Sequence, residues 1–267
     1  MELTIRGLEY SYHRHPVLKG ISFSLDQGEL VCVLGKNGAG KSTLFRCILG
    51  LLKGYQGDIL IDGKDRKHYS ERELAKKIAY IPQNHETAFS FSVLDMVMMG
   101  TTASLPRFAV PGGKEREKAL NALELMKISC LKDRIYGRIS GGEQQLVLIA
   151  RAIAQEARIL VMDEPCSSLD YGNQIRVMDE LRALSEKGYL IVQSTHNPEH
   201  VFYFAHKAMV MMDGKISAFG EPDRVMTKEL LEAVYHVPIE IHEDAKSGKK
   251  MCMPGERRGV CGNYTTV

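Results

Sequence analysis

The chain has 267 residues, 44% hydrophobic and 25% charged, which is typical of a globular protein with one large or two small domains. Its 35 Lys and Arg residues nearly balance 33 Asp and Glu residues, and a net charge of +2 argues against nucleic acid as a main partner. The six cysteines are too scattered for a disulfide scaffold, no apolar run approaches the roughly 18 residues that span a bilayer, and no secretory signal opens the chain. We therefore expect a cytoplasmic protein whose role at a membrane, if it has one, comes through a partner.

The first part of the chain predicts strands followed by a strand, a tight loop and a helix. Residues 3–12 and 21–25 alternate between apolar and polar side chains, as half-buried strands do. Residues 29–35 form a short apolar run that suits a buried strand, residues 35–42 are rich in glycine, and residues 42–52 are apolar at helical spacing. This order is typical of the start of an α/β domain.

Later segments extend the same pattern. Apolar strands are predicted at 158–165 and 189–196, with a helix at 175–188 between them. Buried strands that alternate with helices predict a mostly parallel sheet.

Two regions depart from this alternation. Residues of about 90–156 contain three helical segments without a strand between them, which predicts a helical subdomain inserted into the α/β core, with a Pro/Gly loop at 106–114. A hairpin is predicted to turn at Asp213-Gly214. Residues 237–267 are polar and rich in glycine, so we expect a poorly structured tail.

The strongest chemical signal is a phosphate-binding loop. Residues 35–42 read GKNGAGKS and fit the pattern G-x-x-x-x-G-K-[S/T] between the predicted strand and helix. The glycines let backbone N–H groups approach phosphate oxygens, and the following helix presents its positive end to the same anion. Lys41 should reach the β- and γ-phosphates, and the Ser42 hydroxyl should bind Mg²⁺. The nucleotide-binding residues expected here are Gly35, Lys36, Asn37, Gly38, Ala39, Gly40, Lys41, Ser42 and Thr43.

Two adjacent carboxylates end the strand predicted at 158–165. Asp163 fits a Mg²⁺ partner acting through water, and Glu164 fits the group that activates the attacking water. Such a pair is common at strand ends. With a phosphate loop upstream, the pair indicates a catalytic site, because phosphoryl transfer needs both a metal and a positioned nucleophile.

A third motif, Ser140-Gly141-Gly142-Glu143, precedes a predicted helix. The open N–H groups of a helix N-terminus bind phosphate, so a second phosphate site is one interpretation. On its own the motif indicates only the start of a helix.

Together, the order of the phosphate loop, SGGEQ, LVMDEP, SSLD and STH resembles the ATP-binding cassette of ABC transporters, over about residues 1–236. The resemblance implies a P-loop α/β fold with a mostly parallel core sheet, N-terminal antiparallel strands and an inserted helical subdomain. It implies ATP and Mg²⁺ as cofactors. It also implies a head-to-tail dimer in which each ATP lies between one subunit's phosphate loop and the other's SGG motif.

The resemblance implies roles for four residues that would otherwise be interpreted as structural. Tyr12 matches the aromatic residue that stacks on adenine, and Gln83 matches the glutamine that contacts Mg²⁺ and water and senses the membrane partner. Asp170 matches the loop at the dimer interface, and His196 matches the histidine that contacts the γ-phosphate. Alone, these residues would indicate strand packing, a solvated loop, a helix N-cap and a structural histidine.

Three residues depart from the family's usual pattern, but none carries chemistry. Ile139 replaces the leucine before SGG, Glu143 stands where glutamine is commonest, and Cys166 stands where threonine often follows the proline. We therefore expect an active ATPase with Lys41, Glu164 and His196 as its catalytic residues and Ser42, Gln83 and Asp163 as its metal-binding residues.

The resemblance implies the ATPase subunit of a transporter at the cytoplasmic face of the membrane. Its expected partners are a second cassette, in a homodimer, an integral membrane permease and, indirectly, a substrate-binding protein. Fused exporters, two-cassette translation proteins and DNA-repair ATPases are disfavoured. The chain contains one phosphate loop and no predicted membrane span, and the 99 residues from Lys41 to Ser140 contain no sustained heptad pattern.

The expected cargo follows from the helical segment. Residues 91–100, FSVLDMVMMG, with the Pro/Gly loop and helix after them, resemble the cassettes of metal-chelate importers, and only a short segment follows Tyr235. An iron complex, a siderophore or haem, is the expected cargo. The next residues, GTTAS at 100–104, differ from the stretch usual in that group, so another metal-ion importer and an exporter remain alternatives.

Two further features keep alternative interpretations. The methionines of residues 92–100 suit either core packing or docking to the transmembrane subunit. Cys252 and Cys261, with His236 and His242 upstream, suggest a metal site, but their C-x8-C spacing is not a usual zinc pattern.

Overall fold

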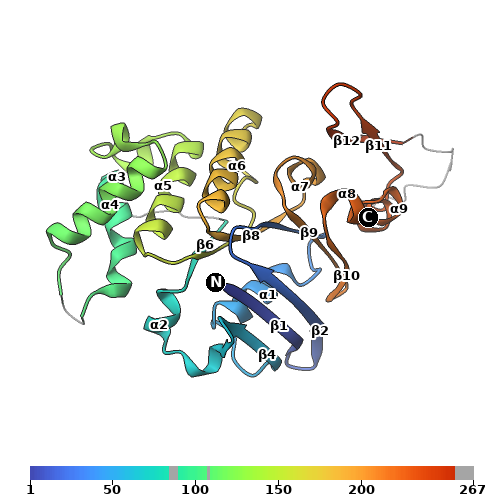
Figure 1. Cartoon of the computed structure of the whole chain (residues 1–267), viewed down its shortest axis with the longest axis horizontal. Coiled ribbons are helices and arrows are strands. Elements are labelled where there is room, and N and C mark those ends of the chain that lie inside the picture. Colours follow the sequence, from blue (N-terminus) through green and yellow to red (C-terminus); the bar gives the residue numbers. More distant parts are fainter. Residues whose placement is uncertain (84–89, 107–108, 256–267) are drawn as a thin grey trace, which may run out of the picture.

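The computed structural model describes residues 1–83, 90–106 and 109–255. An N-terminal antiparallel sheet forms one layer of the molecule, with its strands in the order β2-β1-β4-β5 (Figure 1). Leu3 and Ile5 of β1 are buried against the core, as the predicted alternation requires, and a register shift after Ile5 puts Leu8 on the same face. The strands are β1 (Glu2–Tyr12), β2 (His15–Asp26), β4 (Gln56–Ile61) and β5 (Lys64–Asp65).

The second sheet carries the predicted buried strands in the order β10-β9-β3-β8-β7-β6. All pairs except β9–β10 are parallel, and all five residues of β3 are buried because both faces of the sheet are covered. The prediction of a mostly parallel core sheet beside antiparallel N-terminal strands is confirmed. The strands are β3 (Leu30–Leu34), β6 (Ile78–Ile81), β7 (Ile159–Met162), β8 (Leu190–Thr195), β9 (Lys207–Met212) and β10 (Lys215–Gly220).

The predicted hairpin between β9 and β10 turns at Asp213-Gly214. Both residues have positive φ, 48° and 80°, as a type I′ two-residue hairpin turn requires. The turn prediction is confirmed.

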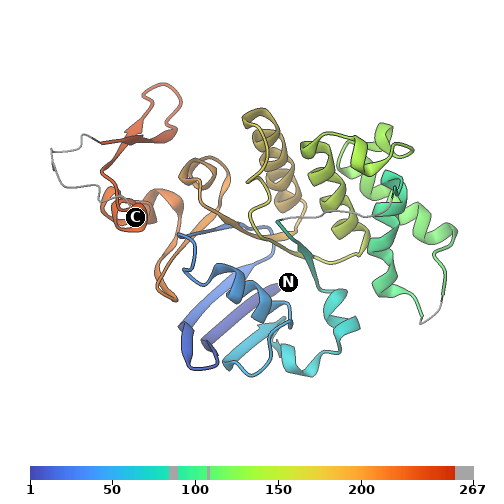
Figure 2. The same cartoon turned by 180° about the vertical axis from the view of Figure 1, so that it is seen from behind.

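Between β6 and β7 the described residues form helices and one isolated β-bridge, Ser92 to Ile135. These helices gather at one end of the molecule, opposite the C-terminal segment (Figure 2). Part of the expected Pro/Gly loop, residues 107–108, lies outside the described residues. The main elements are α3 (Val93–Met98), η2 (Met99–Ser104), α4 (Gly113–Leu125), η3 (Ser129–Leu131), η4 (Tyr136–Arg138) and α5 (Gly141–Ala154).

Helix α3 places most of its apolar side chains in the core. Val93, Leu94, Met96 and Val97 are buried against α4 and α5, whereas Met99, just after the helix, is 37% exposed. This burial favours the core-packing interpretation of the methionines.

The remaining helices pack against the two large sheets and the C-terminal hairpin. In the parts of the chain that the structure describes, none of the helices combines the length and the apolar character needed to cross a bilayer. Their bounds are α1 (Lys41–Ile48), η1 (Arg66–His68), α2 (Glu71–Ala75), α6 (Tyr171–Glu186), α7 (Pro198–Phe204), α8 (Pro222–Val225) and α9 (Lys228–Tyr235).

The C-terminal segment corrects the prediction of a poorly structured tail over 237–267. Strands β11 (Ile239–Glu243) and β12 (Lys250–Pro254) form an antiparallel hairpin that packs against α7 and α9. Ile239 is buried, and Ile241 and Cys252 pack against the same apolar cluster. The polar composition of this segment led to the prediction of a tail, although a few apolar side chains alternate along its strands. Residues 256–267 lie outside the described part of the chain.

Candidate active site

The glycine-rich loop connects the carboxyl end of β3, an interior strand of the core sheet, to α1. Beside it lies a cleft of about 370 Å³ that contains most of the predicted nucleotide-binding residues. Gly35 is the first residue of this loop, and a Cβ atom there would lie 2.5 Å from the Met211 carbonyl oxygen. The cleft is lined by Tyr12, Val17, Lys36, Asn37, Gly38, Ala39, Gly40, Lys41, Ser42, Thr43, Gln83, Asp163 and Glu164.

The shape of the loop fits a chain of phosphates. Gly38 and Gly40 have φ of 83° and 103°, a conformation that other residues rarely adopt. Gly40 precedes α1, and a Cβ there would lie 3.2 Å from the Val17 carbonyl oxygen. The loop therefore brings bare backbone and the positive end of α1 to the cleft, which is the arrangement that binds anions.

Lys41 lies at the bottom of this loop with only 6% of its surface exposed. Its Nζ donates hydrogen bonds to the carbonyl oxygens of Gly35 and Lys36. Burial lowers the pKa of Lys41, and nearby Glu164 and Asp163 partly offset that effect. Because both hydrogen-bond partners are neutral, a phosphate in the cleft would gain a charge-assisted bond from this ammonium.

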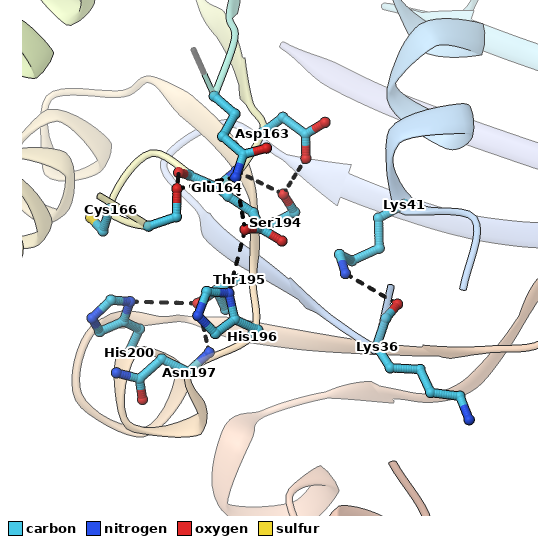
Figure 3. A network of polar contacts seen from close by, with 12 residues as sticks. Lys36, Lys41, Asp163, Glu164, Cys166, Ser194, Thr195, His196, Asn197 and His200 are labelled. Atoms are coloured by element: carbon cyan, nitrogen blue, oxygen red, sulfur yellow. Dashed lines mark hydrogen bonds and ion pairs between the residues drawn. The ribbon is translucent and has the colours of Figure 1, made fainter. Parts of the chain in front are cut away.

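A serine of the neighbouring strand holds the Asp163 carboxylate and the Glu164 backbone at the end of β7 (Figure 3). Ser194 Oγ on β8 donates to Asp163 Oδ1 at 2.6 Å and accepts the Glu164 backbone N–H at 2.9 Å. Glu164 has φ of 47°, a strained conformation for a residue with a side chain, and the bond to Ser194 helps hold it. Ser194 was not among the predicted site residues, although it belongs to the STH motif.

Glu164 brings together two predicted residues from distant segments. Its Oε2 accepts a hydrogen bond from Gln83 Nε2 at 3.3 Å and lies 3.4 Å from His196 Nδ1. Gln83 also donates to Ser167 Oγ at 3.2 Å. The Glu164 side chain is 14% exposed and that of His196 62% exposed, so the carboxylate is held in place while the imidazole remains open to a ligand (Figure 3).

The SGG motif lies elsewhere. Ser140 caps α5 in a reciprocal pair with Glu143, in which each side chain binds the other residue's backbone N–H, and Ser140 and Gly141 are exposed. The structure does not bring these residues, or Gly142, to the cleft beside the phosphate loop.

Asp170 lies close to the SGG motif rather than in the cleft. It caps α6 by accepting the Asn173 backbone N–H at 2.9 Å. Hydrogen bonds from the backbone and the side chain of Asn173 lower the pKa of Asp170. A Cβ at Gly142 would lie 2.4 Å from Asn173, so the starts of α5 and α6 are adjacent. The N-cap interpretation of Asp170 is correct for the single chain.

The residues predicted for Mg²⁺ fit a hard cation. Ser42, Gln83 and Asp163 line the same cleft and supply hydroxyl, amide and carboxylate oxygens, the donors that Mg²⁺ prefers. The alternative C-terminal metal site finds no such support. The described residues contain no group of three His, Cys, Asp or Glu side chains able to hold a metal ion. Cys261 lies outside them.

A buried histidine lies behind the site. His200 on α7 is 6% exposed, with Nδ1 3.5 Å from Thr195 Oγ1 and Nε2 3.3 Å from Gln174 Oε1. Burial and, secondarily, His196 hold its pKa below the usual 6.5.

This histidine predicts a loss of stability in acid. Below pH 6.5 the unfolded chain takes up a proton that folded His200 resists, so the free energy of unfolding falls as pH falls, by up to about 1.4 kcal/mol per pH unit for one proton. H200Q keeps a polar group there but removes the titration. Urea unfolding of both proteins at pH 7.5 and 5.5 should show a smaller loss in the variant. Equal losses would contradict the prediction.

The chain is similar to known proteins over most of its length. A family profile described as ABC transporter matches residues 18–167. An uncharacterized ABC transporter ATP-binding protein of Haemophilus influenzae is 42% identical over 90% of this chain and 92% of its own length. A probable iron chelatin transport ATP-binding protein of Helicobacter pylori is 36% identical over 91% and 97%.

A solved structure agrees over nearly the whole chain. It is described as an inward-facing conformation of a putative metal-chelate type ABC transporter, with a TM-score of 0.84 and 32% identity over 95% of this chain and 97% of that one.

Proposed function

This chain belongs to the ABC transporter family of ATP-hydrolysing cassettes, and from that premise we propose that it powers an importer whose cargo is an iron complex, a siderophore or haem. Lys41 and Glu164 line one glycine-rich cleft, and His196 contacts Glu164 from beside it, which supports this use of ATP hydrolysis. The cargo is supported by the similarity to a probable iron chelatin transport protein and to a metal-chelate type transporter. We assign the ATPase to residues 1–236 and its helical subdomain to about 90–156.

The cleft would hold ATP as a complex with Mg²⁺. Tyr12 lies at its rim and offers a ring for adenine, while the loop N–H groups and Lys41 would bind the phosphates. Ser42 and Asp163, with Gln83, would hold the Mg²⁺. When bound, the metal would neutralise charge on the β- and γ-phosphates.

Hydrolysis would then depend on the side chains around Glu164. Its carboxylate would accept a hydrogen bond from the attacking water, with Gln83 and the backbone bond to Ser194 fixing its direction. The exposed imidazole of His196 would donate to the γ-phosphate while Lys41 stabilises the developing charge.

We further propose that the active unit is a head-to-tail homodimer. Ser140 caps α5 and Gly141 begins it, and both residues are exposed, yet they do not line the cleft of their own chain. A second copy would place them opposite the first copy's phosphate loop, where they would bind the same γ-phosphate. Asp170, beside them at the start of α6, would lie in the interface.

A second cleft suits the permease. It measures about 840 Å³ and combines aromatic, apolar and basic side chains, including Tyr55, Arg66 and Leu51, which is 64% exposed. A short amphipathic helix of a membrane protein would find both apolar and charged contacts there. Tyr80 also lines it, on the strand that leads to Gln83, so docking there would reach the catalytic cleft. We therefore place the protein at the cytoplasmic face of the membrane.

The test is ATP hydrolysis by the full transporter. The cassette is reconstituted with the permease and binding protein encoded beside it, and we expect a ferric chelate on the binding protein to raise the ATPase rate several-fold. Binding protein loaded with Mn²⁺, with an amino acid or with nothing serves as the comparison. Stimulation by one of those ligands, with indifference to ferric chelates, would contradict the cargo.

A further inference from the structure

We propose that Tyr235, the last residue of α9, is a positioning residue for ATP hydrolysis and acts by fixing the place of His196. The inference rests on the role proposed above for His196. It concerns a part of the chain beyond residues 18–167, where the family profile matches.

A direct hydrogen bond joins Tyr235 to the backbone of His196. The Tyr235 hydroxyl donates to the backbone carbonyl oxygen of His196 at 2.6 Å, although the two residues are 39 positions apart. Burial raises the pKa of Tyr235 well above its usual value, so the hydroxyl keeps its proton and remains a donor.

His196 needs such a support because it lies between two elements. Strand β8 ends at Thr195, and α7 begins at Pro198 with Asn197 as its cap. The His196 peptide therefore belongs neither to the sheet nor to the helix. Its carbonyl oxygen receives the Tyr235 hydroxyl, and its imidazole Nδ1 lies 3.4 Å from Glu164 Oε2. Movement of this backbone would move the imidazole relative to Glu164.

The end of α9 is itself held against the phosphate loop. His236, next to Tyr235, ends the helix with φ of 57°, a conformation uncommon for a residue with a side chain. That turn places its Nε2 2.7 Å from Nζ of Lys36, which donates to it. The end of α9 therefore contacts both the phosphate loop and the segment that carries His196.

The C-terminal hairpin packs against both α7 and α9. Val234 of α9 and Val201 of α7 share one buried cluster with Ile239 of β11. The Lys249 ammonium lies 5.5 Å from the centre of the Tyr203 ring on α7. Figure 1 shows α9 and the hairpin at the end of the molecule opposite α3 and α4, with α7 between that end and α6. Tyr235 itself is half-buried and packs against this same cluster.

The test is Y235F, which removes one hydroxyl and keeps the ring. We expect the kcat of ATP hydrolysis by the full chain to fall roughly 3- to 10-fold, the usual net worth of one hydrogen bond. KM for MgATP and the affinity for ADP should stay near wild type, because the phosphate loop is unchanged. Y203F, which removes a hydroxyl from the neighbouring helix, is the matched control and should keep the wild-type kcat.

A double-mutant cycle separates positioning from general stability. If Tyr235 acts through His196, Y235F should cost nothing further in an H196A background, because interacting residues are not additive. Wild-type kcat in Y235F, or the same loss with and without His196, would overturn the proposal. If H196A retained full activity, the proposed role of His196 would fail instead, and with it the premise of this inference.

Discussion

E164Q is expected to lower the rate of ATP hydrolysis about 100- to 10,000-fold while MgATP still binds, since a general base contributes a factor of that size. The amide keeps the shape of the side chain, and its oxygen can still accept the bond from Gln83 Nε2. The bond to Ser194 uses the Glu164 backbone N–H and is unaffected. What is lost is the ability to take a proton from water.

Steady-state ATPase and equilibrium nucleotide binding check this prediction together. E164Q should accumulate as an ATP-bound dimer in size-exclusion chromatography, because closure without hydrolysis cannot be reversed quickly. E180Q is the matched control. It makes the same chemical change on α6, where Glu180 pairs with Lys127 at 2.8 Å, and should keep the wild-type rate. Turnover near wild type in E164Q would assign the base to another group.

The second large effect is expected from S140R, which should abolish hydrolysis while ADP binding to the single chain stays intact. Ser140 is exposed at the start of α5 and does not line the cleft of its own chain, so an arginine there leaves that cleft unchanged. In the dimer the added side chain would fill the place of the γ-phosphate. K41A should instead weaken nucleotide binding in the single chain, because Lys41 is the buried cation of the loop.

Mixed dimers decide whether the site is shared. A dimer of one K41A chain and one S140R chain contains one intact site if each site combines one chain's Lys41 with the other's Ser140. A dimer of a double-mutant chain with a wild-type chain then contains none. We expect ATP hydrolysis in the first arrangement only. If each chain holds a complete site, the double-mutant dimer would hydrolyse ATP and the K41A/S140R dimer would not. That outcome would contradict the head-to-tail arrangement.

The parts of the fold predictable from sequence are those with local signals. A glycine-rich loop between an apolar run and a helical run predicts β3, the loop and α1, and apolar runs predict β7 and β8. The Asp62-Gly63 turn between β4 and β5 is an equally local hairpin signal. Strands β11 and β12 gave a weak signal because only Ile239, Ile241 and Cys252 among their side chains pack in the apolar cluster.

The site residues that could not be predicted depend on contacts across the sequence. Ser194 holds Asp163 from 31 positions away, and Tyr235 reaches His196 across 39. Serine and tyrosine are common residues, and nothing in their neighbours along the chain indicates these partners. The distance of Ser140 from Lys41 within one chain was predictable only through the family resemblance. A sequence motif does not indicate whether it acts with residues of its own chain or with those of a second copy.

The place of β3 in the core sheet also determines when the protein becomes functional during its synthesis. Both neighbours of β3 come late in the chain, and Val31 pairs with Val192, 161 residues further on, and with Lys207. The β1–β2 hairpin can form while the ribosome is still translating the helical region, but β3 cannot enter its sheet until β8 and β9 have emerged. The phosphate loop therefore remains unanchored for most of translation, and the apolar residues of β3 stay available to chaperones or to aggregation throughout that interval.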